Sequence, residues 1–253
     1  MNQRGSETLL SGIVTNWSQV NDPIRFVARY APAIRNYLLA IIRDNHEAED
    51  AAQEFLMKMG ERGFADLKMK PGSRFRDYLI TAVRNSAYSH LKKLERRQRK
   101  EETYHDEGEI VAADEVGGGE ADAQWIAEWR ACALNRALGG LARKERGMSG
   151  SVVHRVLKLR MEHPEAKDAE LAEVLSKQVG RTISPEAYRK QLSRSRRALA
   201  ELLVLEVAET LSAVTPEEVE EELIAVGLME FVEPFLPSDW RERGCLIPEE
   251  DEE

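Results

Sequence analysis

A dense run of carboxylates beside His46 is the first feature of this sequence that could perform chemistry. Positions 46–55 contain four acidic residues, and carboxylates next to a histidine can bind a metal ion or transfer protons. The spacing supports neither role, because no second histidine stands four residues from His46 and no other metal-binding cluster appears. We therefore interpret the run as a solvated or partner-binding helix face. With no phosphate-binding glycine loop or nucleophile motif elsewhere, we expect no catalytic residue, no metal and no cofactor.

The segment 73–100 combines basic and aromatic side chains along one expected helix. Its Lys and Arg residues stand at 74, 76, 84, 92, 93, 96, 97, 99 and 100, with Phe75, Tyr78 and Tyr88 among them. Basic side chains neutralise phosphates, and aromatic rings stack on bases that have left a duplex. The segment thus suits opened, single-stranded DNA. The alternative is that the aromatic rings, Phe75 above all, belong to the core and the charges form a solvated face.

The segment 168–200 predicts a second nucleic-acid contact of a different kind. A short helix, a turn and a long basic helix form a helix-turn-helix pattern, whose second helix would enter the major groove. The expected buried stripe lies at 188, 192, 195 and 199. That stripe leaves the following residues exposed: Glu186, Arg189, Lys190, Ser193, Arg194 and Arg197. A plain helical hairpin is the alternative.

The net charge of −9 conceals a strong segregation of charge along the 253 residues. The basic segments 68–100 and 181–197 alternate with the acidic segments 101–122 and 215–253, which favours two separate nucleic-acid contacts. The first 15 residues lack the pattern of a signal peptide, and no apolar run is long enough to cross a membrane. We expect a cytoplasmic protein without membrane insertion. The two cysteines stand too far apart in sequence to suggest a disulfide framework or a zinc site.

Nearly every ordered segment shows the three- and four-residue apolar spacing of a helix. In the first half the spacing predicts helices over 27–42 and 48–59 and a third that begins near Ser73. In the second half it predicts helices over 125–138, 152–159 and 171–179, a long helix that begins at Ser184-Pro185, and another after Thr215-Pro216. Gly139-Gly140 should end the helix that starts at Trp125. The fold class is therefore all-α.

The acidic, glycine-containing segment 101–124 cannot bury enough apolar surface to offset its ordering entropy. We interpret it as a flexible linker between two small helical domains. The expected boundaries are 12–100 for the first domain, 101–124 for the linker, 125–211 for the second domain, and 212–253 for an acidic C-terminal helix and tail.

Three motifs, in order, resemble bacterial RNA polymerase sigma factors of the extracytoplasmic-function type. The string Asp50-Ala-Ala-Gln53-Glu54-Phe55 resembles the Asp-x-x-Gln-Glu core of sigma region 2. The residues Arg74-Phe75-Arg76-Asp77-Tyr78-Leu79 and Val83-Arg84-Asn85 resemble the helix that follows it. The segment 184–196 resembles the recognition helix of the region 4 helix-turn-helix, and the two ends of the match resemble a planctomycete-like subgroup. Tyr78 replaces the usual Trp, and the turn before Ser184 is longer than usual.

The resemblance implies a transcription initiation factor without catalytic activity. Core RNA polymerase would bind Asp50, Gln53 and Glu54. The −10 element would contact Arg74, Phe75, Arg76, Tyr78, Arg84, Asn85, Tyr88, Lys92, Lys93, Arg96 and Arg97. The −35 element would contact Ser184, Glu186, Arg189, Lys190, Ser193, Arg194 and Arg197. Partners would be core polymerase, promoter DNA and, where one exists, an anti-sigma factor or other regulatory protein.

Two other classes of protein remain open from the sequence. A helix-turn-helix regulator that binds duplex DNA without polymerase would need only the second basic segment. An enzyme that uses the carboxylates near Glu49 would need a site geometry for which the spacing gives no support. The aromatic residues within the first basic segment are what favour the sigma factor.

Overall fold

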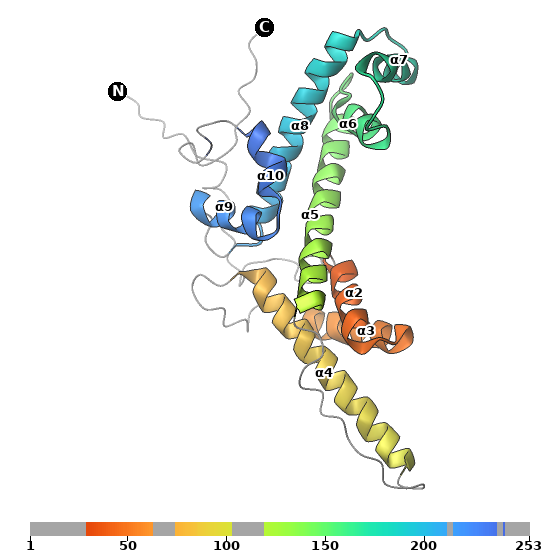
Figure 1. The fold of residues 1–253 in the computed structure, drawn as a ribbon, viewed down its shortest axis with the longest axis vertical. Coiled ribbons are helices and arrows are strands. Elements are labelled where there is room, and N and C mark those ends of the chain that lie inside the picture. Colours follow the sequence, from red (N-terminus) through yellow and green to blue (C-terminus); the bar gives the residue numbers. More distant parts are fainter. Residues whose placement is uncertain (1–28, 63–73, 103–118, 212–214, 237–239, 241–253) are drawn as a thin grey trace, which may run out of the picture. The chain divides into compact units, whose positions relative to one another are not determined.

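The computed structural model describes residues 29–62, 74–102, 119–211, 215–236 and 240 (Figure 1). Within these residues the secondary structure is helical and contains no strand, which confirms the expected all-α class. None of the described helices is both long enough and apolar enough to cross a membrane. The expected cap at Ser73, most of the acidic linker and the C-terminal tail lie outside the described residues.

The chain divides into two compact units. The first unit is Thr15–Cys132 with Thr210–Ala213, and the second is Met1–Val14, Ala133–Glu209 and Val214–Glu253. Helix α5 (Gly119–Gly147) contributes its first part to the first unit and the remainder to the second.

Three helices, α2 (Ala31–Ile42), α3 (Asn45–Arg62) and α4 (Phe75–Glu102), form the frame of the first unit. A sharp corner separates α2 from α3, where Arg43 takes a left-handed backbone conformation with φ 61°. The Asp44 carboxylate then accepts a hydrogen bond from the backbone N–H of Glu47 at 2.8 Å, which satisfies an otherwise unpaired donor in the first turn of α3. The apolar face of α2 is buried: Ala33, Ile34, Tyr37, Leu38, Ile41 and Ile42.

Aromatic rings from distant parts of the sequence meet in the core of this unit. Tyr30 stacks on Trp129 with ring centroids 3.7 Å apart and planes 4° from parallel. The Phe75 ring lies 6.4 Å from that of Trp129, and Trp125 meets the edge of Tyr37 at 5.5 Å. Trp125 is 0% exposed and Trp129 2%, so these rings supply a large share of the buried apolar surface.

This aromatic core corrects the expected boundary between linker and second domain. The sequence assigned 101–124 to the linker and began the second domain at Trp125. The structure continues α4 to Glu102, begins α5 at Gly119 and places Trp125 and Trp129 in the first unit. The physical reason is burial against Tyr30 and Phe75, a long-range contact that local periodicity does not reveal.

The second unit contains a compact three-helix arrangement of α6 (Val153–Glu162), α7 (Asp168–Val179) and α8 (Pro185–Ala208). Its core consists of Leu141, Val152, Val156, Leu157, Leu159, Leu171, Ala172, Leu175, Tyr188 and Leu192. Helix α7 ends at Gly180, which has φ 69°, and the Ser184 hydroxyl caps α8 by accepting from the backbone N–H of Ala187 at 3.1 Å. The structure confirms the predicted start of α8 at Ser184-Pro185.

Helix α5 does not end at Gly139-Gly140 as predicted. It continues to Gly147 because Gly140 lets it approach α8 closely: a Cβ atom at that position would lie 3.3 Å from a methyl carbon of Leu202. The close packing of two helices thus outweighs the poor helix propensity of a glycine pair.

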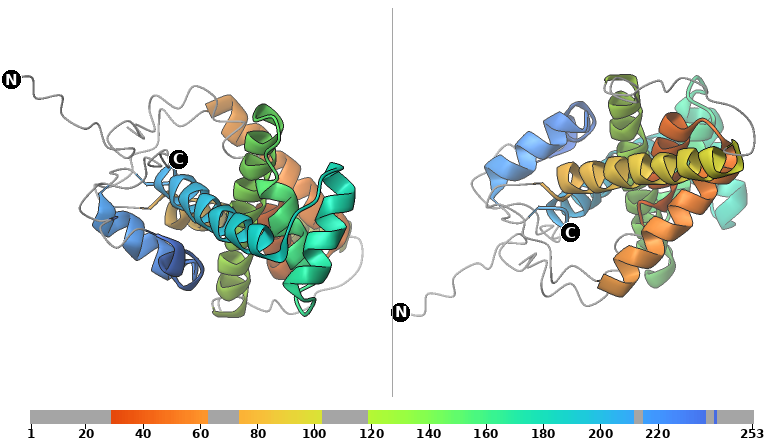
Figure 2. Two further views of the ribbon diagram at one scale, coloured as in Figure 1. Left: turned by 90° about the horizontal axis from the view of Figure 1, so that it is seen from above. Right: turned by 90° about the horizontal axis from the view of Figure 1, so that it is seen from below.

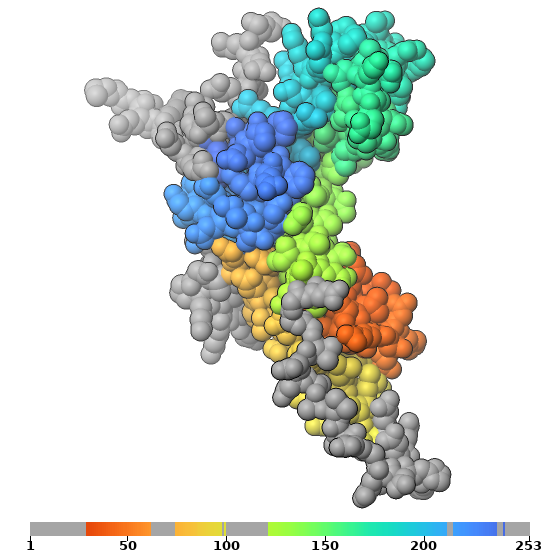
Figure 3. Space-filling view, viewed as in Figure 1, coloured from red at the N-terminus to blue at the C-terminus, as the bar shows by residue number. Residues whose placement is uncertain are grey.

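The acidic C-terminal helices pack on α8 (Figure 2). Helix α9 (Pro216–Ala225) begins at Thr215, whose hydroxyl accepts from the backbone N–H of Glu218 at 3.2 Å, as its sequence predicts. It is followed by α10 (Met229–Val232) and the 3-10 helix η2 (Glu233–Phe235). Figure 3 shows the side chains of α9 and α10 as a continuous blue surface beside α8.

We expect Trp129→Ala in the full chain to lower the free energy of unfolding by about 3–5 kcal/mol, because it removes a buried aromatic side chain from the core of the first unit. Chemical denaturation followed by circular dichroism would measure the change. Ile126→Ala, on the half-buried face of the same helix, is the control and should cost less. A loss below about 1 kcal/mol for Trp129→Ala would contradict the assignment of this segment to the first unit.

Candidate nucleic-acid interface

Helix α4 presents three different faces. The first is apolar, and its residues at four-residue steps, Phe75, Leu79, Val83 and Ala87, are all 0% exposed. The second face is turned toward α3 and lines a pocket with it. The third face contains Arg84, which pairs with Asp122 of α5. Figure 1 shows the last turns of α4 extending beyond α2 and α3. The second half of the helix holds Lys92, Lys93, Arg96 and Arg97, all of which are exposed.

Two of the residues predicted to contact DNA are buried in the structure. Phe75 is 0% exposed within the aromatic core, and Arg76 is 8% exposed with its guanidinium 3.3 Å from the carboxylate of Asp77. The prediction of these two as DNA contacts is therefore corrected. They lie on the core side of α4, and their motif position reflects packing. The remaining predicted positions are half-buried or exposed: Arg74, Tyr78, Arg84, Asn85, Tyr88, Lys92, Lys93, Arg96 and Arg97.

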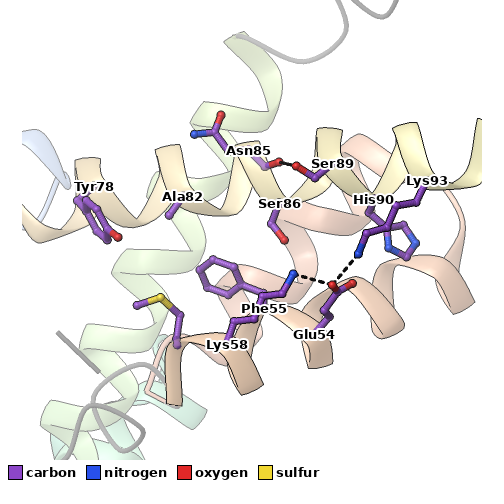
Figure 4. A pocket seen from close by; sticks show the side chains of 11 residues that line it. Glu54, Phe55, Lys58, Tyr78, Ala82, Asn85, Ser86, Ser89, His90 and Lys93 are labelled. Atoms are coloured by element: carbon purple, nitrogen blue, oxygen red, sulfur yellow. Dashed lines mark hydrogen bonds and ion pairs between the residues drawn. The ribbon is translucent and has the colours of Figure 1, made fainter. Parts of the chain in front are cut away.

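A pocket of about 240 Å³ lies between α3 and α4 (Figure 4). Its apolar lining comes from Phe55, Met59, Tyr78 and Ala82, and its polar lining from Glu54, Lys58, Asn85, Ser86, Ser89, His90 and Lys93. Apolar side chains, two of them aromatic, beside amide, hydroxyl and ammonium groups suit an aromatic heterocycle that also forms hydrogen bonds. The sequence identified Tyr78, Asn85 and Lys93 as contacts. It missed the pocket, because Ser86 and Ser89 join it only when α3 packs against α4.

Glu54 links the predicted polymerase-binding face of α3 to the predicted DNA-binding helix α4. Lys58 donates to its Oε1 at 2.6 Å and Lys93 donates to the same oxygen at 2.7 Å, as Figure 4 shows. These hydrogen bonds, from Lys58 first and Lys93 second, lower the pKa of the Glu54 carboxyl from 4.5 to about 2. A residue predicted to bind polymerase and a residue predicted to bind the −10 element thus bind each other in this structure.

The other carboxylates of the acidic run at positions 46–55 also have partners within the protein. Glu47 accepts from the Nε2 of His90 at 2.7 Å, Glu49 pairs with Arg35, and Asp50 lies 3.6 Å from the ring of His46. Across the described residues, no group of three or more His, Cys, Asp or Glu side chains could hold a metal ion. The pairs of Glu47 and Glu49 instead join α3 to α4 and to α2.

Asp50 and Gln53 lie on the exposed side of α3, with Met57 in line with them. Both predicted residues are exposed, and the Met57 side chain is 66% exposed. Since residues three, four and seven positions apart share a helix face, the three side chains form one stripe. The sequence pattern gave no sign that Met57 is exposed, because an apolar residue in a helix normally indicates the core.

Arg84 takes part in a three-way contact on the opposite side of α4. Its Nε donates to the hydroxyl of Tyr37 at 2.9 Å and its Nη2 donates to Oδ1 of Asp122 at 2.6 Å. The Tyr37 hydroxyl donates to the same Asp122 oxygen at 2.9 Å. Burial raises the pKa of the Tyr37 phenol to about 12, so that the hydroxyl remains a donor. The hydrogen bonds to Tyr37 and Asp122 raise the pKa of Arg84.

The second unit exposes the complete set of residues predicted for the −35 element. Ser184, Glu186, Arg189, Lys190, Ser193, Arg194 and Arg197 are all exposed on α8. The buried stripe is Tyr188, Leu192 and Ser195, as predicted, while Leu199 is only half-buried. Arg189 forms an ion pair with Asp168 at the start of α7, with Nε and Oδ2 3.8 Å apart.

The first unit is an α-helical module with a basic helix, an adjoining polar pocket and an acidic helix face. Residues 26–97, which contain α2, α3 and most of α4, match the family model Sigma-70 region 2. The match covers less than a third of the chain and supports a sigma-70 family factor with a role in RNA polymerase binding and promoter melting. No curated protein and no solved structure matches the chain.

We expect Glu54→Gln to change stability in a pH-dependent way. The folded-state pKa of about 2 lies below the ordinary 4.5, so the ion pairs stabilise the protein above pH 4.5 and lose this effect as the pH falls to about 2. Because the carboxylate is 37% exposed, water screens the pairs and the difference from wild type should be about 0.5–1 kcal/mol at neutral pH. Urea denaturation between pH 7 and pH 2 would measure it.

Glu61→Gln, on the same helix, controls for the removal of one negative charge. An equal stability difference for Glu54→Gln at pH 7 and at pH 2 would contradict the ion-paired state of Glu54.

Proposed function

We propose that this protein is a sigma factor of the extracytoplasmic-function type that binds core RNA polymerase and directs promoter recognition and melting. The observation that carries the proposal is the Sigma-70 region 2 match across α2, α3 and α4, the helices that form the pocket and the basic surface. The protein would act without catalysis in the cytoplasm and belong to a planctomycete-like subgroup. A regulatory partner such as an anti-sigma factor would control its access to polymerase.

In this proposal α4 binds the −10 element as opened DNA. The exposed cations Lys92, Arg96 and Arg97 would neutralise phosphates of the non-template strand. The neighbouring pocket, with Tyr78 and Asn85 in its lining, would receive a base that has left the stack. Stacking and hydrogen bonds inside the pocket would offset the cost of unpairing that base. Promoter melting therefore needs no catalytic residue on this protein.

Core polymerase would bind the exposed stripe of α3. Asp50 and Gln53 support this assignment by their exposure and by their place in the motif that resembles the sigma region 2 core. Glu54 would contribute less directly, since Lys58 and Lys93 already occupy one of its oxygens. We therefore assign the primary contacts to Asp50 and Gln53.

Helix α8 would bind the −35 element as duplex DNA. Its exposed side chains project from the second helix of a helix-turn-helix, the helix that such motifs insert into the major groove. Arg189, Lys190 and Arg194 can donate to guanine edges or to phosphates. The same observation favours the second candidate, a helix-turn-helix regulator that binds duplex DNA and not polymerase.

Binding to core polymerase separates the two candidates. We expect the full chain to co-elute with bacterial core RNA polymerase in gel filtration, and Asp50→Ala/Gln53→Ala to weaken the complex by about tenfold or more through loss of two interface contacts. The matched control is Gln124→Ala/Glu128→Ala, which likewise removes one amide and one carboxylate, from the α5 part of the same unit.

Equal weakening by both double variants would argue against α3 as the docking face. Absence of any complex with wild type, together with retained duplex binding, would support the stand-alone regulator instead.

We expect Lys190→Ala to weaken the affinity for promoter duplex of the complex between this protein and core polymerase. Loss of one phosphate contact should reduce the slope of log K against log salt concentration by about 0.9. A filter-binding titration at several salt concentrations would measure the slope. Lys177→Ala is the control, because that exposed lysine on α7 pairs with Glu173 and is not part of the predicted DNA surface. An unchanged slope for Lys190→Ala would remove Lys190 from the DNA surface.

A further inference from the structure

Asp122, on α5, lies beside the basic helix α4 at a place that would suit a phosphate group. Its Oδ1 accepts one hydrogen bond from the guanidinium of Arg84 and one from the hydroxyl of Tyr37, at 2.6 and 2.9 Å. Among the described residues these two carry the side-chain contacts of Asp122. An anionic oxygen between an arginine and a hydroxyl is also the arrangement in which proteins bind DNA phosphates.

Arg84 heads a line of side chains that continues along the exposed part of α4. Tyr88 and Lys92 follow it at four-residue steps and therefore lie on nearly the same face of the helix. Tyr88 is half-buried and Lys92 is exposed. A nucleic-acid strand that follows this face toward the start of α4 meets Arg84 after Lys92 and Tyr88.

Buried aromatic rings hold Asp122 at this place. Trp125, three residues after Asp122 on α5, packs against Tyr37. Trp129, one turn later on the same helix, stacks on Tyr30. Because these rings are almost completely buried, the carboxylate stays beside Arg84 at a high effective concentration. The contact itself is accessible, since the side chain of Arg84 is 33% exposed and that of Asp122 is 41% exposed. A competing anion from solution can therefore reach the guanidinium.

We propose that Asp122 is an intramolecular competitor for nucleic-acid phosphate at Arg84, anchored by Trp125 and Trp129, and that it weakens DNA binding by the protein. The proposal rests on the proposed binding of DNA by α4. It gives the first turns of α5 a function in addition to packing. It also accounts for a predicted DNA-binding arginine that the structure finds already paired.

The test compares Asp122→Asn with Glu128→Gln in the full chain. Both substitutions remove one negative charge from α5, but only the first acts on Arg84. The asparagine side chain keeps an oxygen that can accept from the Tyr37 hydroxyl, so the variant chiefly loses charge. Circular dichroism would confirm that both variants keep their helices. Binding to a fluorescent single-stranded oligonucleotide is then measured by anisotropy at several salt concentrations.

We expect Asp122→Asn to bind about fivefold more tightly than Glu128→Gln near 0.1 M salt. The slope of log K against log salt should steepen by about 0.7, the value of one additional phosphate contact on a single strand. Adding Arg84→Ala to Asp122→Asn should abolish the gain. A structural loosening of α5 would instead give a gain that persists without Arg84, and that result would overturn the proposal.

Equal affinity and equal slope for the two single variants would also overturn it. If the proposed function itself is wrong, neither the wild type nor either variant would bind the oligonucleotide, even at the lowest salt concentration. That result would contradict DNA binding by α4 itself.

Discussion

The stacking of Tyr30 on Trp129 is the contact on which the arrangement of the first unit depends. It joins the residue just before α2 to a residue in α5, and Phe75 at the start of α4 packs against the same pair. Burial of a tryptophan side chain removes about 150–250 Å² from water, worth about 4–6 kcal/mol before entropic costs. The position of α5 beside α4, and with it the carboxylate of Asp122 beside Arg84, follows from this contact.

Local features of the sequence predicted the helices well where short-range chemistry determines them. The cap at Ser184, the proline after it and the end of α7 at Gly180 depend on neighbouring residues, and the structure confirms them. The prediction failed at Gly139-Gly140, because helix propensity says nothing about the space beside Leu202. It also failed at the start of α5, because the rings that pack on the two tryptophans, Tyr30, Tyr37 and Phe75, stand far earlier in the chain.

The candidate site shows the same division between local and long-range causes. The charge of α4 and the exposed face of α8 could be predicted, since alternation of apolar and charged residues fixes which side of a helix meets water. Motif similarity could not distinguish a surface arginine from a packed one, and Arg76 proved to be buried. Pairings across helices, such as Lys93 with Glu54, were also invisible, because they depend on how α3 and α4 cross. For this reason the number of basic residues on α4 overstates the number of cations without a carboxylate neighbour.

Helix α4 performs three tasks on three sides of one continuous helix of 28 residues. Leu79 and Val83 face the core, Ser86 and Ser89 face the pocket, and Arg84 faces Asp122. Each residue of an α-helix is turned by about 100° from the one before it. A single inserted or deleted residue near Ala82 would therefore rotate everything after it and disconnect all three sides at once. Homologous proteins with the same architecture can vary the side chains of this helix, but its length between Phe75 and Lys93 should remain constant.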